Sequence, residues 1–258
     1  MYGAIYGDLA GSVYEFLQLK RIKSINPTEL ITEESFYSDD TILIIAILDS
    51  ILSNGDYEKY LRDYIQEYKE YLPNFKPYFK YSFSPTLIKW SESFVNGTSH
   101  GNGAMMRISP VGYMFDSEDE VKENAKMATM PSHNSEEAID SATTIALIIF
   151  YLRKGYTKEE IFNRMNLVVK YKPFNRFNTS CKETIGNCLY AFYNSNSFED
   201  AIRKTLLMGG DTDTNCAIVG GMAEALYGID YSLVELVNKK IPEQFVKVLS
   251  KSKGNIIY

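Results

Sequence analysis

The sequence predicts an all-α fold, organised as a single compact multi-helix domain over residues 1–258. Apolar residues recur at helical spacing from one end of the chain to the other. Capping and stop residues flank several of these segments, and alternating strand-like patterns are scarce. We therefore expect about ten helices, with no linker, repeat or low-complexity segment between them.

The first predicted helix carries a glycine at every fourth position. Gly3, Gly7 and Gly11 leave one helix face bare, so that a neighbouring helix can pack closely against it. Asp8 and Glu15 are seven residues apart and fall on one side, with Glu15 where this helix would run out into a loop. An acidic pair on a buried face is costly unless it meets a cation or hydrogen-bond donors.

The later helices are marked by their end signals as well as by their periodicity. A capping box opens a helix at Thr157, and Ser197 can cap another. Gly155 and Gly228 are expected to end the helices that precede them. Helical spacing is seen at Leu61, Tyr64, Ile65 and Tyr68, and again at Ala138, Ala142, Ile145, Ala146, Ile149 and Leu152. The loops are expected at residues 26–37, 72–85, 95–109, 131–135 and 172–179.

Composition excludes several classes of protein. The chain has 27 Lys and Arg against 33 Asp and Glu, a net charge of −6, which gives no electrostatic footprint for nucleic acid or an anionic membrane. The longest apolar runs, 42–48 and 145–152, fall well short of a membrane span. Three cysteines without CxxC spacing argue against a disulfide framework or a zinc site. We expect a cytoplasmic monomer with neither a membrane nor a nucleic-acid partner.

Two acidic segments stand at predicted helix starts. Ser38, Asp39, Asp40 and Thr41 directly precede the apolar run 42–48. The segment 209–214 places Asp211, Asp213 and Thr214 before a helix rich in small residues. Carboxylates and hydroxyls are ligands for magnesium, calcium or manganese, and four converging carboxylates would need about two divalent ions. Alone, the first segment also fits a doubled helix cap. The Asp-x-Asp pattern of the second also occurs in calcium loops, in glycosyltransferases and in plain turns.

Two further loop segments carry unusual residues. Gly101, Asn102 and Gly103 permit close approach of a ligand, and successive N–H groups in such a turn can bind an anion such as a pyrophosphate, although a tight turn explains them as well. Arg107 could serve a phosphate or pair with a core carboxylate, and we favour a structural role. His133 stands in a short polar loop, where a lone histidine is usually exposed or supports other residues.

In this order, the segments resemble the ADP-ribosylglycohydrolase family, with the closest likeness to its bacterial branch. The matching segments are 7–15, Ser38–Thr41, 101–112, Ser132–Asn134, 209–214 and 223–228, together with Ala201–Arg203. The resemblance implies an all-α fold with two Mg²⁺ or Mn²⁺ ions in a central cleft. It assigns the metal ligands to Ser38, Asp39, Asp40, Asp211, Asp213 and Thr214, with Ser38 standing where many members have Thr.

The resemblance also implies a reaction, hydrolysis of the glycosidic bond between ADP-ribose and a protein side chain or small-molecule acceptor. Glu15 matches a glutamate near the scissile bond, and Glu15 or a ligand aspartate such as Asp40 would act as acid or base. Gly101, Asn102, Gly103 and His133 match positions that line the ADP-ribose groove.

Other functions remain open at this point. The chain could bind ADP-ribose without cleaving it, act as a two-metal phosphohydrolase on the pyrophosphate, or be a calcium-stabilised helical domain. The sequence does not identify three features of such a site. They are the acceptor, the choice of Mg²⁺ or Mn²⁺, and the aromatic residue that stacks on adenine. We expect the loops around residues 20–37 and 72–85 to bind the acceptor.

Overall fold

The described part of the chain is built from helices alone. The computed structural model describes residues 1–73, 82–93 and 95–252, and within them the only β pairing is two isolated bridges. The helices of the first half are α1 (Tyr2–Ser12), α2 (Glu15–Gln18), α3 (Asp39–Leu52), α4 (Tyr57–Tyr68), α5 (Pro85–Ser91), α6 (Gly103–Met106), α7 (Ser109–Met114) and α8 (Glu118–Thr129). Those of the second half are α9 (Glu136–Arg153), α10 (Lys158–Arg164), α11 (Cys181–Tyr193), α12 (Phe198–Met208), α13 (Thr212–Tyr227), α14 (Tyr231–Lys240) and α15 (Glu243–Ser252). The predicted all-α class is confirmed.

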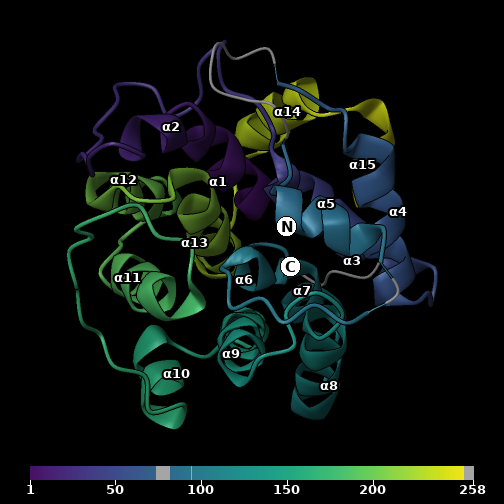
Figure 1. Cartoon of the computed structure of the whole chain (residues 1–258). Coiled ribbons are helices and arrows are strands. Elements are labelled where there is room, and N and C mark those ends of the chain that lie inside the picture. The colour runs from purple at the N-terminus through teal and green to yellow at the C-terminus, as the bar shows by residue number, and fades with distance from the viewer. Residues whose placement is uncertain (74–81, 94, 253–258) are drawn as a thin grey trace.

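The centre of the molecule is the pair α1 and α13, which make the most extensive helix contact (Figure 1). The glycine spacing of α1 explains it: a Cβ on Gly7 would lie 2.0 Å from the carbonyl oxygen of Cys216, on α13. Glu224 on α13 accepts the backbone N–H of Gly3 at 2.7 Å and so binds the start of α1. The bare face predicted from the sequence is therefore the surface that brings residues 8 and 211–214 together.

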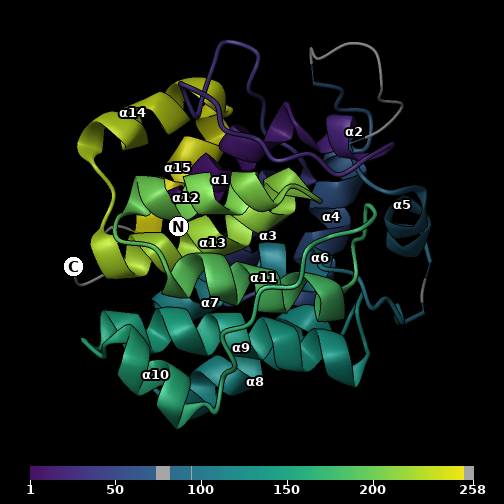
Figure 2. The ribbon, with the colours of Figure 1, turned by 90° about the vertical axis from the view of Figure 1, so that its left-hand side faces the viewer.

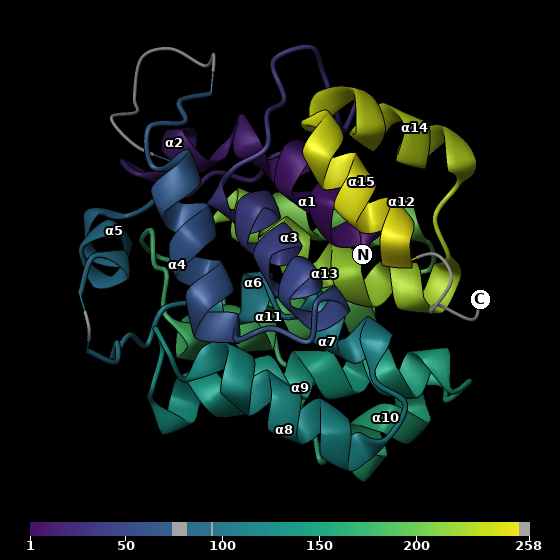
Figure 3. The ribbon, with the colours of Figure 1, turned by 90° about the vertical axis from the view of Figure 1, so that its right-hand side faces the viewer.

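The remaining helices form layers around this pair. Helices α8 and α9 lie on one side of it, and α14 and α15 lie on the other, in both side views (Figures 2 and 3). Helix α3 is almost fully buried, and it packs against α4, α7 and α15. The first turns of α3 and α13 consequently lie inside the molecule, where Asp40 and Asp213 are buried.

Most end signals in the sequence are borne out. Ser38, Thr157 and Ser197 cap α3, α10 and α12 with their side chains. Gly155 and Gly228 adopt positive φ angles of 85° and 74° after α9 and α13.

The expected loop 95–109 needs correction, because it contains α6 and the first residue of α7. A short helix begins there because the backbone carbonyl of Asn102 accepts the N–H groups of Met105 and Met106. Likewise α1 ends at Ser12, so Glu15 begins the separate helix α2 instead of continuing α1. Part of the expected loop 72–85 lies outside the described residues, and its last residue begins α5. None of the described helices is long and apolar enough to span a membrane.

Candidate active site

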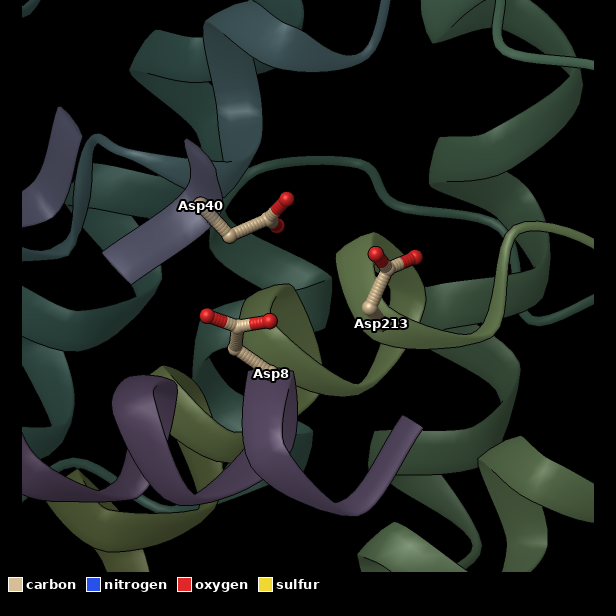
Figure 4. A group of neighbouring side chains, drawn as sticks. All are labelled: Asp8, Asp40 and Asp213. Carbon is tan, nitrogen blue, oxygen red and sulfur yellow. The ribbon is translucent and has the colours of Figure 1, made fainter. Parts of the chain in front are cut away.

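The site forms where α1, α3 and α13 meet. Asp8 comes from the middle of α1, Asp40 from the first turn of α3 and Asp213 from the first turn of α13, and their carboxylates point toward one another (Figure 4). One oxygen of each lies within 4.8 Å of the others. The predicted convergence of the two acidic segments is thus observed, with Asp8 as an additional member.

Asp8 holds the start of α3 in place. Its carboxylate accepts the backbone N–H groups of Ser38 and Thr41, at 2.9 and 3.1 Å. The hydroxyls of the same two residues donate to it at 2.8 and 2.5 Å. Four donors satisfy a carboxylate that is fully buried, which offsets its desolvation. The carboxylate therefore sets the position of Asp39 and Asp40 relative to α1.

A second acidic group adjoins the first. Oxygens of Glu15, Asp211 and Asp213 also lie within 4.8 Å of one another. Asp213 belongs to both groups, so the two form one continuous acidic region. Thr214 Oγ1 lies 3.2 Å from an oxygen of Asp40 and closes the gap between α13 and α3.

Burial disfavours the ionised form of these clustered carboxylates. Desolvation, followed by repulsion from Asp213, raises the pKa of Asp8 to about 7 and the pKa of Asp40 well above its ordinary value. The same two causes raise the pKa of Glu15 and of Asp39. Desolvation also raises the pKa of Asp211 and Asp213. Within the described residues, no ion pair with Lys or Arg involves any of these carboxylates.

The residues present fit a divalent cation. One oxygen of Asp40, Oδ1, is buried and has no hydrogen-bond partner among the described residues, which costs free energy unless a cation meets it. The donors are carboxylate and hydroxyl oxygens, which are the ligands that Mg²⁺ and Mn²⁺ prefer. The sharing of Asp213 between two groups suits two neighbouring ions.

The glycine loop, residues 97–103, adjoins the acidic region and is held in place on both sides. Gly97 exchanges backbone hydrogen bonds with residues 131 and 134, at 2.8 and 3.0 Å. On the other side, the N–H of Asn102 donates to the carbonyl of Thr179 at 2.7 Å. The Asn102 side chain donates to Asp211 at 2.7 Å and so connects this loop with the acidic region.

A buried arginine stands behind the histidine beside this loop. Arg107 is 1% exposed, and it donates to the Ser132 hydroxyl at 2.7 Å and to the carbonyl of Ala128 at 3.2 Å. Ser132 Oγ is in turn 2.7 Å from Nδ1 of His133. Burial, followed by the charge of Arg107, lowers the pKa of His133 well below its usual range. Arg107 pairs with no carboxylate in the described chain, so the expected pairing with a core carboxylate is wrong. Its buried side chain instead holds Ser132 and the end of α8.

A cleft of about 660 Å³ joins the acidic region and the glycine loop. This volume suits a ligand of nucleotide size. The aromatic side chains along its walls are Phe16, Phe36, Phe83 and Trp90. The cleft therefore offers an acidic end, an apolar wall and a glycine-lined end.

Comparison with known proteins identifies the family. A family model described as ADP-ribosylglycohydrolase matches residues 1–256. The chain belongs to the ADP-ribosylglycohydrolase family. The ADP-ribosylarginine hydrolase Tri1 of Pseudomonas putida (strain GB-1) is 25% identical over 97% of this chain and 76% of its own length. The human ADP-ribosylhydrolase ARH3 is 22% identical over 88% of this chain and 84% of its own.

A solved structure supports the shared fold. The protein, described as an ADP-ribosylglycohydrolase-related protein complex, superposes with a TM-score of 0.74 at 19% identity. The match covers 98% of this chain and 95% of that chain. The helical arrangement is therefore that of the family.

All the site residues expected of this ADP-ribosylglycohydrolase family member line the one cleft. They are Glu15, Ser38, Asp39, Asp40, Gly101, Asn102, Gly103, His133, Asp211, Asp213 and Thr214. Asp39 is half-buried and lies outside the two close carboxylate groups. Sequence reasoning placed Asp8 on a helix face but not in the site, because its partners Ser38 and Thr41 are about 30 residues away.

Proposed function

We propose that this chain hydrolyses the glycosidic bond between ADP-ribose and an acceptor, using two Mg²⁺ or Mn²⁺ ions held at the acidic end of the cleft. Membership of the ADP-ribosylglycohydrolase family makes the chain a glycohydrolase. The observation that carries the finer proposal is the pair of buried carboxylate groups that share Asp213 and lack a basic partner in the described chain.

We assign the ligands as Ser38, Asp39, Asp40, Asp211, Asp213 and Thr214. The unpartnered oxygen of Asp40 and the raised pKa values of the aspartates support this assignment, because cations would relieve both. Asp8 stands behind them and orients the first turn of α3. Ions held by these residues would contact the ribose hydroxyls and lower the pKa of a coordinated water molecule.

The remaining chemistry falls to the residues that face the cleft. Water adds its hydroxyl to the anomeric carbon of the ribose, the bond from that carbon to the acceptor breaks, and the acceptor takes the proton. Glu15 lines the cleft next to Asp211 and Asp213, and we assign it as the acid that passes a proton to the departing acceptor atom. Asp40, which also lines the cleft, is the alternative acid or base.

At the other end, Gly101, Asn102, Gly103 and His133 would bind the ADP-ribosyl group. Gly101 and Gly103 are half-buried and carry no side chain, so a phosphate or ribose can approach their backbone closely. An ADP-ribosylated protein or an ADP-ribose-containing small molecule is the substrate class. ADP-ribosylarginine is the first acceptor to test, because Tri1 is named for it.

The deciding experiment is a panel of ADP-ribosylated substrates incubated with Mg²⁺ or with Mn²⁺, with EDTA as the control. We expect free ADP-ribose as the product, and no product after chelation. AMP together with ribose phosphate would establish a phosphohydrolase instead. Tight ADP-ribose binding without any turnover across the panel would establish a binding protein.

A further inference from the structure

A chain of three side chains sits behind the glycine-lined end of the cleft. Arg107, at the end of α6, donates from Nη2 to the hydroxyl of Ser132 at 2.7 Å, and that hydroxyl lies 2.7 Å from Nδ1 of His133. All three side chains are at least nine-tenths buried. The direction of each hydrogen bond in this chain can be deduced from what each group is able to donate.

The guanidinium fixes the first direction, because arginine has only donors. The Ser132 oxygen must therefore accept from Arg107, and the hydroxyl hydrogen is left to donate elsewhere. The only other partner of that hydroxyl within the described residues is Nδ1 of His133. If Nδ1 carried a proton, the serine would accept twice and its own hydrogen would be buried without an acceptor, which costs free energy. The favoured arrangement leaves Nδ1 as an acceptor and the ring proton on Nε2.

The surroundings oppose a second proton on the ring. Arg107 is a buried cation that has no carboxylate partner in the described chain, and a charge on the nearby ring would repel it. The carbonyl of Ala128, in the last turn of α8, holds the guanidinium in place, where the C-terminal end of a helix favours a cation. His100, an exposed residue, is the other titratable group that acts on His133, and it opposes protonation in the same way.

The other ring nitrogen faces the ligand space. No hydrogen bond in the described chain reaches Nε2, and His133 lines the cleft. A Cβ on Gly103 would lie 3.3 Å from Nε2, and one on Gly101 would lie 3.6 Å from it. The glycines thus leave Nε2 open to a group bound over the turn.

We propose that Arg107 and Ser132 are positioning residues that fix His133 as a neutral hydrogen-bond donor, aimed through Nε2 at an acceptor oxygen of the bound ADP-ribosyl group. The ligand half of this inference rests on the proposed function. A ribose or phosphate oxygen can accept such a bond, whereas a ligand group that must itself donate is rejected. Neither positioning residue needs to touch the ligand.

The test reads the tautomer directly by nitrogen-15 NMR of labelled histidines in the free protein. The chain has only two histidines, so the H100N variant assigns the signals. In the wild type we expect His133 to show a protonated, pyrrole-type Nε2 and an unprotonated, pyridine-type Nδ1. In Ser132→Ala we expect the proton to distribute over both nitrogens, and in Ser132→Thr, which keeps the hydroxyl, we expect the wild-type pattern.

Ligand binding provides the second readout, by calorimetry with ADP-ribose and Mg²⁺. Ser132→Ala is expected to weaken binding roughly 3- to 10-fold, the effect of one hydrogen bond, and Ser132→Thr to restore it. The matched control is Ser195→Ala. Ser195 is also a buried serine whose hydroxyl is hydrogen-bonded, to the carbonyl of Phe192, and it does not line the cleft. This control should leave both the tautomer and the affinity unchanged.

Several outcomes would overturn the proposal. A wild-type His133 that carries its proton on Nδ1, or on both nitrogens at neutral pH, contradicts it. So does an unchanged Nε2-protonated ring in Ser132→Ala. Absence of ADP-ribose binding by the wild type would instead refute the proposed function and the ligand contact, while the spectra of the free protein still decide the role of Arg107 and Ser132.

Discussion

The two ends of the cleft are both buried, but their charges are arranged in opposite ways. At one end, six carboxylates gather without a basic partner in the described chain, and desolvation with mutual repulsion raises their pKa values. At the other end, a buried cation, Arg107, has no carboxylate partner and stands behind a neutral His133. At both ends the buried charges lack a partner of opposite sign in the described chain. Cations would stabilise the carboxylates at the acidic end, and an anionic or oxygen-rich ligand suits the glycine-lined end.

The largest effect on the acidic end is expected from removing Asp213, the residue shared by both carboxylate groups. Loss of a residue that only supports a metal ligand typically costs about 10- to 100-fold in metal affinity or activity. Asp213→Ala removes a proposed ligand and should reduce Mg²⁺ affinity and turnover by more than this. The helical circular-dichroism spectrum should be unchanged, because the side chain of Asp213 accepts the backbone N–H of only one other residue of α13, Thr214, and its removal relieves repulsion between buried carboxylates. Asp63→Ala, at an exposed site on α4, is the control. Full activity in Asp213→Ala would refute the metal assignment.

The acidic end should also make stability depend on pH and on Mg²⁺. The pKa of Asp8 is about 7 in the folded protein, above its ordinary value of 3.8, so the folded state holds the proton more tightly than the unfolded chain. The associated stability is fully present below about pH 4 and is lost as the pH rises through about 7. In EDTA the free energy of unfolding should therefore fall by on the order of 1 kcal/mol per pH unit within this window.

Thermal unfolding from pH 5 to 8, with and without Mg²⁺, measures this effect. Mg²⁺ should raise the melting temperature most at the alkaline end, because it binds the ionised carboxylates. An equal Mg²⁺ effect at pH 5 and pH 8 would argue against a cation at these carboxylates.

The helix contact beneath the acidic end can be tested by adding one methyl group. Gly7→Ala would place a Cβ 2.0 Å from the Cys216 carbonyl oxygen and should destabilise the fold by about 1–3 kcal/mol or more. Gly186→Ala, within α11 and with 3.9 Å of space, should instead be neutral or stabilise by up to about 1 kcal/mol. Chemical denaturation measures both. Equal effects of the two variants would show that α1 is free to move away from α13.

The smallest effect is expected at the residue that connects the two ends. Asn102 donates to Asp211 at 2.7 Å, and this bond lowers the pKa of Asp211. Asn102→Ala should weaken Mg²⁺ binding about tenfold through loss of this support. Asn102→Asp removes the same donor and places a further carboxylate beside Asp211, which raises the pKa of Asp211, so its Mg²⁺ affinity should fall more steeply on acidification than that of Asn102→Ala. Titration calorimetry with Mg²⁺ ranks the two variants, and a tighter-binding Asn102→Ala would contradict the role given to this amide.

The local part of the structure was predictable. The spacing of Gly3, Gly7 and Gly11 indicated the close contact that α1 makes, and Thr157 and Ser197 do cap the helices predicted for them. These features depend on residues within a few positions of one another. The order of the family motifs also identified the segments that line the cleft.

Helix α6 falls within the expected loop 95–109, because hydrogen bonds to distant loops set that backbone. The 97–102 segment is pinned to residues 131–134 on one side and to Thr179 on the other, and only then does the chain turn into α6. Propensity alone favours a loop at Gly101-Asn102-Gly103. Tertiary contacts therefore decided this region.

By itself, the sequence determined the helical class, the helix ends and the presence of oxygen ligands at two helix starts, since each follows from short-range spacing and side-chain chemistry. Only the tertiary structure decided that Asp8 joins the acidic end, that Asp213 is shared, and that Arg107 acts through Ser132 on His133. Those relations are set by the burial and approach of segments far apart in the chain, and burial is also what makes their charges and hydrogen bonds energetically decisive.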